Sequence, residues 1–240
     1  MDRLISGALR LGISLTPGQV EQFERYYREL VEWNKRLNLT RIVDYEEVQT
    51  KHFLDSLTPV KALGGGALRG GWRLIDVGTG AGLPGIPLKI LFPEMAVVLL
   101  DSAAKKAKFL HYIIHALGLE NVEVVAGRAE EVARQEKYRE KFPVVVSRAV
   151  APLAVLAELT LPFCAVGGRF VAQKKGEVSE ELDAAQQGIG LLGGRLSEVQ
   201  EVDLPELGEK RLLIIIEKTS STPEKYPRRP GMPAKRPVGT

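Results

Sequence analysis

The sequence has a single cysteine, Cys164, so the chain cannot form an internal disulfide. This usage fits a reducing compartment, and we expect the protein to be cytoplasmic. No stretch approaches the roughly 18 consecutive apolar residues that a membrane span requires, and residues 1–15 lack the apolar run of a signal peptide. The sequence therefore predicts no association with a membrane.

The chain also lacks a large excess of charge of either sign, because its net charge is only +3. Residues 220–240 contain five basic side chains against Glu224, which gives this tail +4 and leaves about −1 on residues 1–219. A basic, proline-rich tail on a nearly neutral body favours an anionic partner. A solvated, disordered terminus explains the same composition equally well.

Metal-binding patterns are lacking as well. His111 and His115 are four residues apart on a predicted helix, a spacing that can hold a metal, but no third ligand is evident. We therefore predict no metal site. No long exposed apolar face is apparent either, so the expected state is a monomer.

The first 68 residues are predicted to form a helical extension. Thr16, Pro17 and Gln19 form a helix start with a capping box, and apolar residues follow at helical spacing from Val20. A second helix start is expected at Asp44. The glycine-rich run at 64–71 is predicted to be a flexible loop that closes the extension.

Residues 69–219 alternate short apolar strands with helical stretches. Strands are expected at 72–77, 96–101, 122–127, 142–149 and 169–174, followed by a hairpin of two strands within 195–218. A helix is expected over 153–165, with Cys164 in its apolar end. Alternation of this kind predicts an α/β fold with a mostly parallel sheet and helices on both faces. The "GG" turn before the fifth strand and the final hairpin resemble the last part of a class I methyltransferase, which implies a Rossmann-like, seven-stranded sheet with a terminal antiparallel hairpin.

The stretch "DVGTGAGLPG" at 76–85 follows the first predicted strand. From Gly80 it matches the dinucleotide pattern G-x-G-x-x-G, and from Asp76 it matches D-x-G-x-G-x-G. Ligands of open parallel sheets bind at such a first strand–helix turn, where glycine lets the backbone approach them closely. We expect Asp76, Gly78, Gly80 and Gly82 to form a cofactor-binding loop.

A second acid, Asp101, ends the next strand 21 residues after Gly80. An acid there accepts hydrogen bonds from ribose hydroxyls, which NAD and S-adenosylmethionine share. Asp76 ahead of the glycines favours a cationic sulfonium cofactor over a pyrophosphate. The terminal hairpin also favours S-adenosylmethionine.

The turn after the fourth strand, "SRAVAP" at 147–152, faces the reactive methyl group in this fold. It lacks the Asn/Asp-Pro-Pro-aromatic motif used for exocyclic amino groups, and it lacks a cysteine that could attack a pyrimidine ring. No acid in the turn offers a general base. An acceptor with a free lone pair, such as guanine N7, needs only in-line positioning. Arg148 is the side chain expected to provide it.

Seven motifs, in order, resemble the bacterial 16S ribosomal RNA guanine-N7 methyltransferases, also called glucose-inhibited division protein B. They are "FERYYRELVEWNKRLNLTRI", "KHFLDSL", "DVGTGAGLPGIPLKI", "LLDSAAKKAKFL", "GRAEE", "SRAVAPL" and "KYPRRPGMPAKRP". The resemblance covers residues 16–236 and implies methyl transfer from S-adenosylmethionine to one guanine N7 of 16S rRNA. It implies cofactor contacts at Gly78, Leu83, Asp101, Ser102, Ala103, Ala129, Glu130 and Arg148. Leu83 stands where the family often has phenylalanine, which removes ring stacking.

The implied partner is 16S rRNA, within the small ribosomal subunit or its precursor. Candidate RNA contacts are basic side chains that can pair with phosphates, together with a histidine in "KHFLDSL": Lys174, Arg228, Arg229, Lys235, Arg236 and His52. Lys174 is the strongest of these, because it ends the fifth strand on the ligand side of the sheet.

Two alternatives remain open from the residues. Gly80-x-Gly82-x-x-Gly85 with Asp101 also suits an NAD-dependent Rossmann oxidoreductase, although no catalytic Tyr-x-x-x-Lys is evident. The basic tail suits a non-catalytic RNA-binding scaffold with a vestigial cofactor site.

Overall fold

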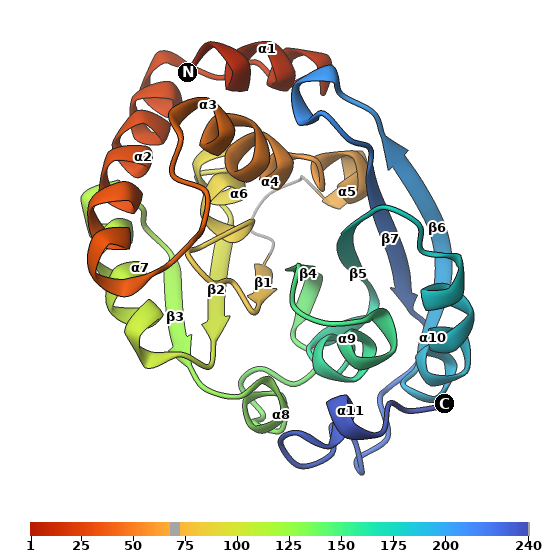
Figure 1. The fold of residues 1–240 in the computed structure, drawn as a ribbon. Coiled ribbons are helices and arrows are strands. Elements are labelled where there is room, and N and C mark those ends of the chain that lie inside the picture. The colour runs from red at the N-terminus through yellow and green to blue at the C-terminus, as the bar shows by residue number, and fades with distance from the viewer. Residues whose placement is uncertain (68–72, 240) are drawn as a thin grey trace.

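The computed structural model describes residues 1–67 and 73–239, and its centre is one seven-stranded sheet (Figure 1). The strand order is β3-β2-β1-β4-β5-β7-β6; β1 to β5 are parallel, and β7 runs antiparallel to both β5 and β6. The predicted mostly parallel sheet with a terminal antiparallel hairpin is confirmed. The strands are β1 (Arg73–Val77), β2 (Ala96–Asp101), β3 (Val122–Ala126), β4 (Phe142–Arg148), β5 (Cys164–Lys175), β6 (Gly194–Val202) and β7 (Arg211–Lys218).

Helices cover both faces of this sheet. They are α1 (Asp2–Arg10), α2 (Pro17–Leu37), α3 (Tyr45–Glu47), the π-helix η1 (Val48–Leu54), α4 (Asp55–Leu57), α5 (Val60–Ala67), α6 (Gly85–Leu91), α7 (Ala104–Ala116), α8 (Ala129–Val132), α9 (Leu153–Thr160), α10 (Ser179–Leu191), the 3₁₀ turn η2 (Pro205–Leu207) and α11 (Met232–Lys235). Within the described ranges, none of these helices is long and apolar enough to cross a bilayer.

The sheet is buried on both sides, since successive strand residues point to opposite faces. Leu74 and Leu99 belong to one core cluster, whereas their chain neighbours Ile75 and Leu100 belong to the other. Strands buried on both faces read as continuous apolar runs, which explains why "LIDV" and "VVLLD" carry almost no alternation of polar residues.

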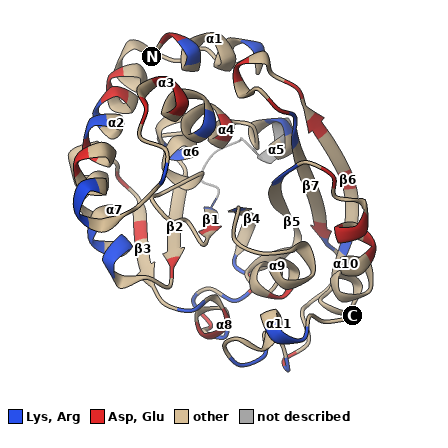
Figure 2. Ribbon diagram, in the orientation of Figure 1, with Lys and Arg blue, Asp and Glu red and all other residues tan. Residues whose placement is uncertain are grey.

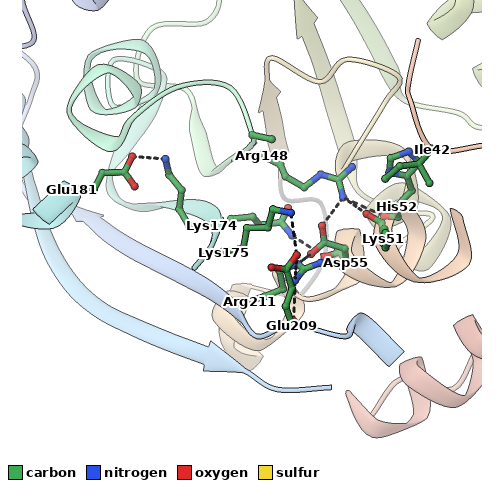
Figure 3. Close-up of a pocket in the computed structure, with 12 residues that line it drawn as sticks. Ile42, Lys51, His52, Asp55, Arg148, Lys174, Lys175, Glu181, Glu209 and Arg211 are labelled. Atoms are coloured by element: carbon green, nitrogen blue, oxygen red, sulfur yellow. Dashed lines mark hydrogen bonds and ion pairs between the residues drawn. The ribbon is translucent and has the colours of Figure 1, made fainter. Parts of the chain in front are cut away.

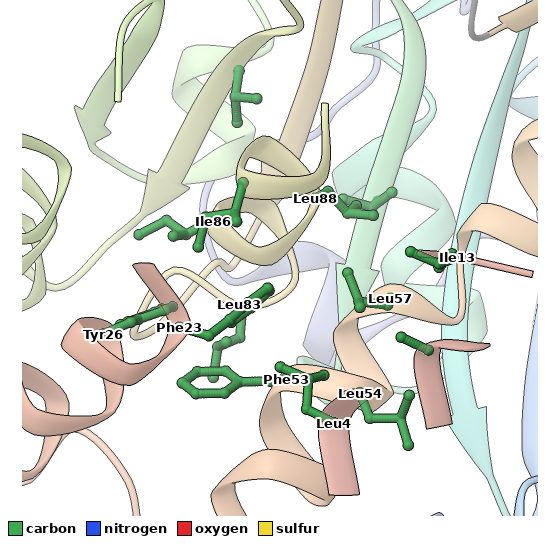
Figure 4. Packing of buried hydrophobic residues seen from close by; sticks show 14 of the residues in the cluster. Leu4, Ile13, Phe23, Tyr26, Phe53, Leu54, Leu57, Leu83, Ile86 and Leu88 are labelled. Atoms are coloured by element: carbon green, nitrogen blue, oxygen red, sulfur yellow. The ribbon is translucent and has the colours of Figure 1, made fainter. Parts of the chain in front are cut away.

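The N-terminal helices α1 to α4 pack on one face together with α6 and α7. Figure 4 shows side chains of α1, α2, η1, α4 and α6 in this core. Thr16 caps α2 as predicted: its Oγ1 accepts from Gln19 N at 3.2 Å, and the Gln19 side chain accepts from Thr16 N at 2.9 Å. Phe23 of α2 and Phe53 of η1 then pack with tilted rings, whose centroids are 5.1 Å apart. The helical extension and the sheet therefore share one hydrophobic core.

The predicted flexible loop at 64–71 is wrong for residues 64–67, because α5 continues through them to Ala67. Residues 68–71, and Trp72 at the predicted start of β1, lie outside the described residues. The predicted helix over 153–165 is also too long. It ends at Thr160, two residues before Pro162, and Cys164 begins β5 instead, where it is buried as expected.

The opposite face is covered by α9, α10 and the C-terminal tail. Tyr226 and Val238 from the tail belong to the same core cluster as Leu156 of α9 and Ile189 of α10. The tail is thus folded against the sheet domain, and the alternative of a disordered terminus is excluded for residues 220–239.

Candidate functional site

Two pockets lie next to each other along the carboxyl ends of the parallel strands. The first, which we call the glycine-loop pocket, has a volume of about 240 Å³ at the ends of β1, β2 and β3. The second, the Arg148 pocket, has a volume of about 610 Å³ at the ends of β4 and β5 and the start of β7. Because the loops that follow parallel strands meet at one edge of a sheet, this is where ligands of such folds bind.

The turn after β4 separates the two pockets. Arg148 and Ala149 line the Arg148 pocket, whereas Val150 and Ala151 line the glycine-loop pocket. Gly78 has a φ of +78°, and a Cβ at this position would lie 2.4 Å from Val150 Cγ2. Only glycine therefore permits this close approach of the two loops.

Asp76 organises the glycine loop from inside the protein. Its Oδ2 accepts hydrogen bonds from Thr79 Oγ1 at 2.6 Å and from Gly85 N at 2.8 Å. Its Oδ1 is buried and has no hydrogen-bond partner among the described residues. Burial raises the pKa of Asp76 to about 6, against the opposing effect of these hydrogen bonds and of Arg148.

Asp101 ends β2 in the wall of the glycine-loop pocket. Its Oδ2 accepts from Gly80 N at 2.9 Å and lies 3.1 Å from Lys106 Nζ, and its Oδ1 accepts from Ala103 N at 2.9 Å. One carboxylate therefore ties the glycine loop to the start of α7. Since each carboxylate oxygen has two acceptor positions, Asp101 keeps capacity for a ligand hydroxyl.

Predicted cofactor residues divide by position. Gly78, Asp101, Ser102, Ala129 and Glu130 line the glycine-loop pocket. Gly80, Gly82 and Ala103 shape its loops without lining it.

Leu83 differs from the expectation of an apolar cofactor contact. Its side chain is buried in the core beside Phe23 and Phe53, and it does not line the glycine-loop pocket (Figure 4). The leucine therefore fills core space beneath the glycine loop.

The floor of the Arg148 pocket is a buried cluster of ion pairs (Figure 3). Asp55 Oδ2 accepts from Arg148 Nη1 at 2.9 Å, and Asp55 Oδ1 accepts from Arg211 Nε at 2.8 Å. Arg148 Nη1 also donates to the carbonyl oxygens of Lys51 and His52 at 3.3 and 3.4 Å. Arg148 is thus fixed between the π-helix and the turn that separates the pockets.

His52 lines the Arg148 pocket, as the sequence predicted for an RNA contact, but it is 91% buried. Its Nε2 lies 2.8 Å from Thr40 Oγ1. Burial, with the nearby Arg148 guanidinium, lowers the pKa of His52 to about 4. His52 is therefore neutral at pH 7 and is a weak base.

Lys174 lines the same pocket, and its ammonium group is engaged within the chain. Lys174 Nζ donates to Glu181 Oε1 at 2.6 Å and to the carbonyl of Ala151 at 2.8 Å. Glu181 in turn accepts from Leu153 N at 2.7 Å. Lys174 thus holds the turn after β4 as well as contributing positive charge.

The predicted RNA contacts of the tail also divide. Arg228 binds Glu158 inside the protein, with Nη2 2.6 Å from Oε2. Arg229, Lys235 and Arg236 are exposed, and no described acid forms an ion pair with them. Figure 2 shows basic residues on α11, beside α8 and α9.

Sequence reasoning missed several residues that line the two pockets. Asp55 stands inside the "KHFLDSL" motif, and Arg211 and Gln173 stand on strands, yet no local pattern indicated that they meet. Gln173 Nε2 donates to the carbonyl of Asp55 at 2.7 Å, and its buried Oε1 has no partner among the described residues. Pro233 also lines the glycine-loop pocket, although the sequence predicted only RNA contacts in the tail to which it belongs.

In residues 1–67 and 73–239, no group of three or more His, Cys, Asp or Glu side chains is arranged to hold a metal ion.

Comparisons with known proteins find a matching family model and similar full-length sequences. The GidB family model, described as rRNA small subunit methyltransferase G, matches residues 19–212. The ribosomal RNA small subunit methyltransferase G of Dehalococcoides mccartyi strain CBDB1 is 52% identical over 238 residues, which cover 99% of this chain and 100% of that protein. The protein of the same name from Pelotomaculum thermopropionicum is 53% identical over 232 residues, which cover 97% of this chain and 96% of that one.

Solved structures share the fold at low sequence identity. A mutant of MtNAS in complex with S-adenosylmethionine has a TM-score of 0.56 and 20% identity, covering 85% of this chain and 74% of that one. A mutant 16S rRNA (adenine(1408)-N(1))-methyltransferase from Catenulisporales acidiphilia has a TM-score of 0.52 and 16% identity, covering 63% and 87%. The fold is therefore that of the class I methyltransferases. The oxidoreductase and scaffold alternatives find no support in the comparisons.

Proposed function

The chain belongs to the rRNA small subunit methyltransferase G family, and from this premise we propose that it methylates N7 of one guanine in 16S ribosomal RNA. The methyl donor is S-adenosylmethionine, which supplies an electrophilic methyl group on a sulfonium cation. The observation that carries the proposal is the pair of pockets on one edge of the sheet, parted by the turn that bears Arg148. One pocket suits the methyl donor and the other suits the acceptor base.

The glycine-loop pocket fits an adenosyl sulfonium cofactor. Its apolar wall of Leu100, Val155 and Leu159 suits the faces of a purine, and Asp101 suits ribose hydroxyls. The buried, unpartnered Oδ1 of Asp76 adds an electron-rich atom behind the loop. Such a site favours a cation over a pyrophosphate.

The Arg148 pocket suits a nucleotide whose reacting atom needs no deprotonation. Its walls carry five cationic and three anionic side chains, so the pocket attracts phosphate groups. Each of its acids is paired: Asp55 with two arginines, Glu181 with Lys174, and Glu209 with Lys175 and Arg211. Because His52 is also a weak base, none of these described groups is suited to general-base catalysis. Guanine N7 already presents a lone pair.

The protein should methylate small ribosomal subunits isolated from a strain that lacks this activity. We expect label from S-[methyl-³H]adenosylmethionine to enter 16S rRNA, and borohydride–aniline treatment to cleave that RNA at one new guanine. Naked 16S rRNA and precursor particles, assayed in parallel, identify the form of the substrate. Label in 16S rRNA without aniline cleavage would place the methyl group elsewhere than N7, and binding of NADH without S-adenosylmethionine would refute the donor.

Cofactor affinity should rise as the pH increases from 5 to 7. Asp76 has a pKa raised to about 6, so its carboxyl is protonated below that pH and ionised above it. A cationic cofactor favours the ionised form, so binding lowers the pKa of Asp76 and releases a proton near pH 6. A downward shift of one pKa unit corresponds to about a fivefold gain in affinity between pH 5 and pH 7, and to about tenfold over the whole titration.

Calorimetry of S-adenosylmethionine binding at several pH values measures this dependence. The isosteric variant Asp76→Asn cannot ionise and is the matched control, expected to lose the slope. A slope that persists in Asp76→Asn would assign the pH dependence to another group.

A further inference from the structure

The C-terminal tail reaches the glycine-loop pocket. Pro233 and Ala234 of the short helix α11 line that pocket together with Val155 and Leu159 of α9. Figure 1 shows α11 beside α9 and α8, near the C-terminal end of the chain and far from the N-terminal helices. Residues more than 100 positions beyond Asp101 thus share a cavity with it.

A buried ion pair holds the tail in this position. The Glu158 side chain on α9 is fully buried, and its Oε1 accepts from Arg228 N at 2.7 Å and from Arg228 Nε at 2.9 Å. Its Oε2 accepts from Arg228 Nη2 at 2.6 Å. The same Nη2 donates to the carbonyl of Arg236 at 2.6 Å, across the tail segment. Arg228 therefore closes residues 228–236 into a loop around its own guanidinium group.

A second contact joins the tail to the turn after β3. The backbone N of Gly231 donates to Glu130 Oε1 at 3.0 Å, and Arg128 Nη2 lies 3.3 Å from the same oxygen. Glu130 is buried and lines the glycine-loop pocket. The tail thus orients a side chain that we assign to the cofactor.

Both ends of the tail are anchored as well. Arg139 donates to the carbonyl oxygens of Tyr226 and Thr222, at 2.9 and 2.8 Å, where the tail begins. At the other end, Val238 O approaches α10 so closely that a Cβ on Gly188 would lie 2.2 Å from it. Anchors on both sides leave the α11 segment little freedom to move away from the pocket.

We propose that Pro233 and Ala234 form the outer wall of the adenine subsite, and that the Arg228–Glu158 pair is the positioning element that keeps this wall in place. This inference rests on the proposed function, since it names a further part of the same cofactor site. The ligand class is an adenine nucleoside. Arg228 therefore serves the cofactor pocket rather than rRNA phosphates, while Arg229, Lys235 and Arg236 keep their exposed charge for RNA.

Binding of S-adenosylhomocysteine and of adenosine to the full-length protein, measured by calorimetry, tests the wall directly. Pro233→Gly removes the apolar contact, and we expect both ligands to bind about tenfold more weakly. Methionine lacks the adenine, so its affinity should be the same for the variant and for the unaltered protein. Unchanged adenosine affinity in Pro233→Gly would overturn the proposal. Failure of the unaltered protein to bind S-adenosylhomocysteine would instead refute the proposed function.

The positioning role of Arg228 is tested by steady-state kinetics. Arg228→Ala should raise the KM for S-adenosylmethionine about tenfold with little change in kcat, and Arg228→Lys should restore part of the loss. Lys225→Ala, which removes an exposed cation from the same tail, is the matched control and should keep the KM unchanged. A tenfold fall of kcat in Arg228→Ala at unchanged KM would contradict the positioning role. If Arg228→Ala fails to fold, Arg228→Lys and Pro233→Gly still decide the question.

Discussion

Replacing Asp55 with alanine is expected to lower the free energy of unfolding by about 3–5 kcal/mol, the cost of breaking a buried ion pair by removing one partner. Asp55 is buried, and its two oxygens accept from Arg148 and Arg211 at 2.9 and 2.8 Å. Arg211 itself is almost fully buried. Alanine would leave two guanidinium groups without their anion in a region where water cannot fully replace it.

Urea denaturation followed by circular dichroism measures this loss. Glu209→Gln is the matched control, because Glu209 also pairs with Arg211, at 3.4 Å, but is half exposed. Exposed pairs contribute about 0–1 kcal/mol, so the control should stay within that range. A loss below about 1 kcal/mol for Asp55→Ala would mean that solvent already screens this cluster.

The second large effect is expected on cofactor binding. Asp101→Ala should weaken the binding of S-adenosylmethionine about 10- to 100-fold, which corresponds to the roughly 1–3 kcal/mol of charge-assisted hydrogen bonds. The carboxylate lines the glycine-loop pocket and also fixes Gly80 N at 2.9 Å. The variant therefore loses both a ligand contact and the order of the loop.

Lys106→Met separates the carboxylate from its ion pair. This change removes the cation 3.1 Å from Asp101 but leaves the acid in place. Since the Lys106 side chain is partly exposed, we expect cofactor affinity to stay within about threefold of the unaltered protein. Calorimetry on both variants decides the matter; equal affinities for Asp101→Ala and the unaltered protein would remove Asp101 from the site.

Much of the fold could be predicted because its signals are local. The capping box at Thr16 and the apolar strand runs depend on residues a few positions apart, and the structure confirms them. The glycine loop was recognisable for the same reason, since Asp76 and Gly85 are nine residues apart and bond directly. The extent of β5 was missed, because Cys164 and its neighbours read equally well as the end of an apolar helix.

Apart from His52 on the π-helix, the predicted residues that line the two pockets lie at strand ends or in the turns that follow them. Asp101 was predicted from its place at the end of β2, and Glu130 from the family resemblance of the turn after β3; both line the glycine-loop pocket. Asp55 and Arg211 are 156 residues apart, and no pattern of spacing predicts that they share an ion pair. The inward pairing of Arg228 was missed for the complementary reason, since its charge was visible in the sequence but its buried partner was not.

Local chemistry along the chain was enough to predict the α/β class, to single out the glycine loop as a candidate cofactor site and to show that the turn after β4 contains no acid. The surroundings of the charged side chains were decided by long-range packing. What a charged group can do depends on whether a distant element buries it and supplies a partner of opposite charge. The tail illustrates this division. Five basic residues suggested an RNA-binding arm, whereas Arg228 turns inward to Glu158, which is buried on α9, and Pro233 of the same tail lines the glycine-loop pocket.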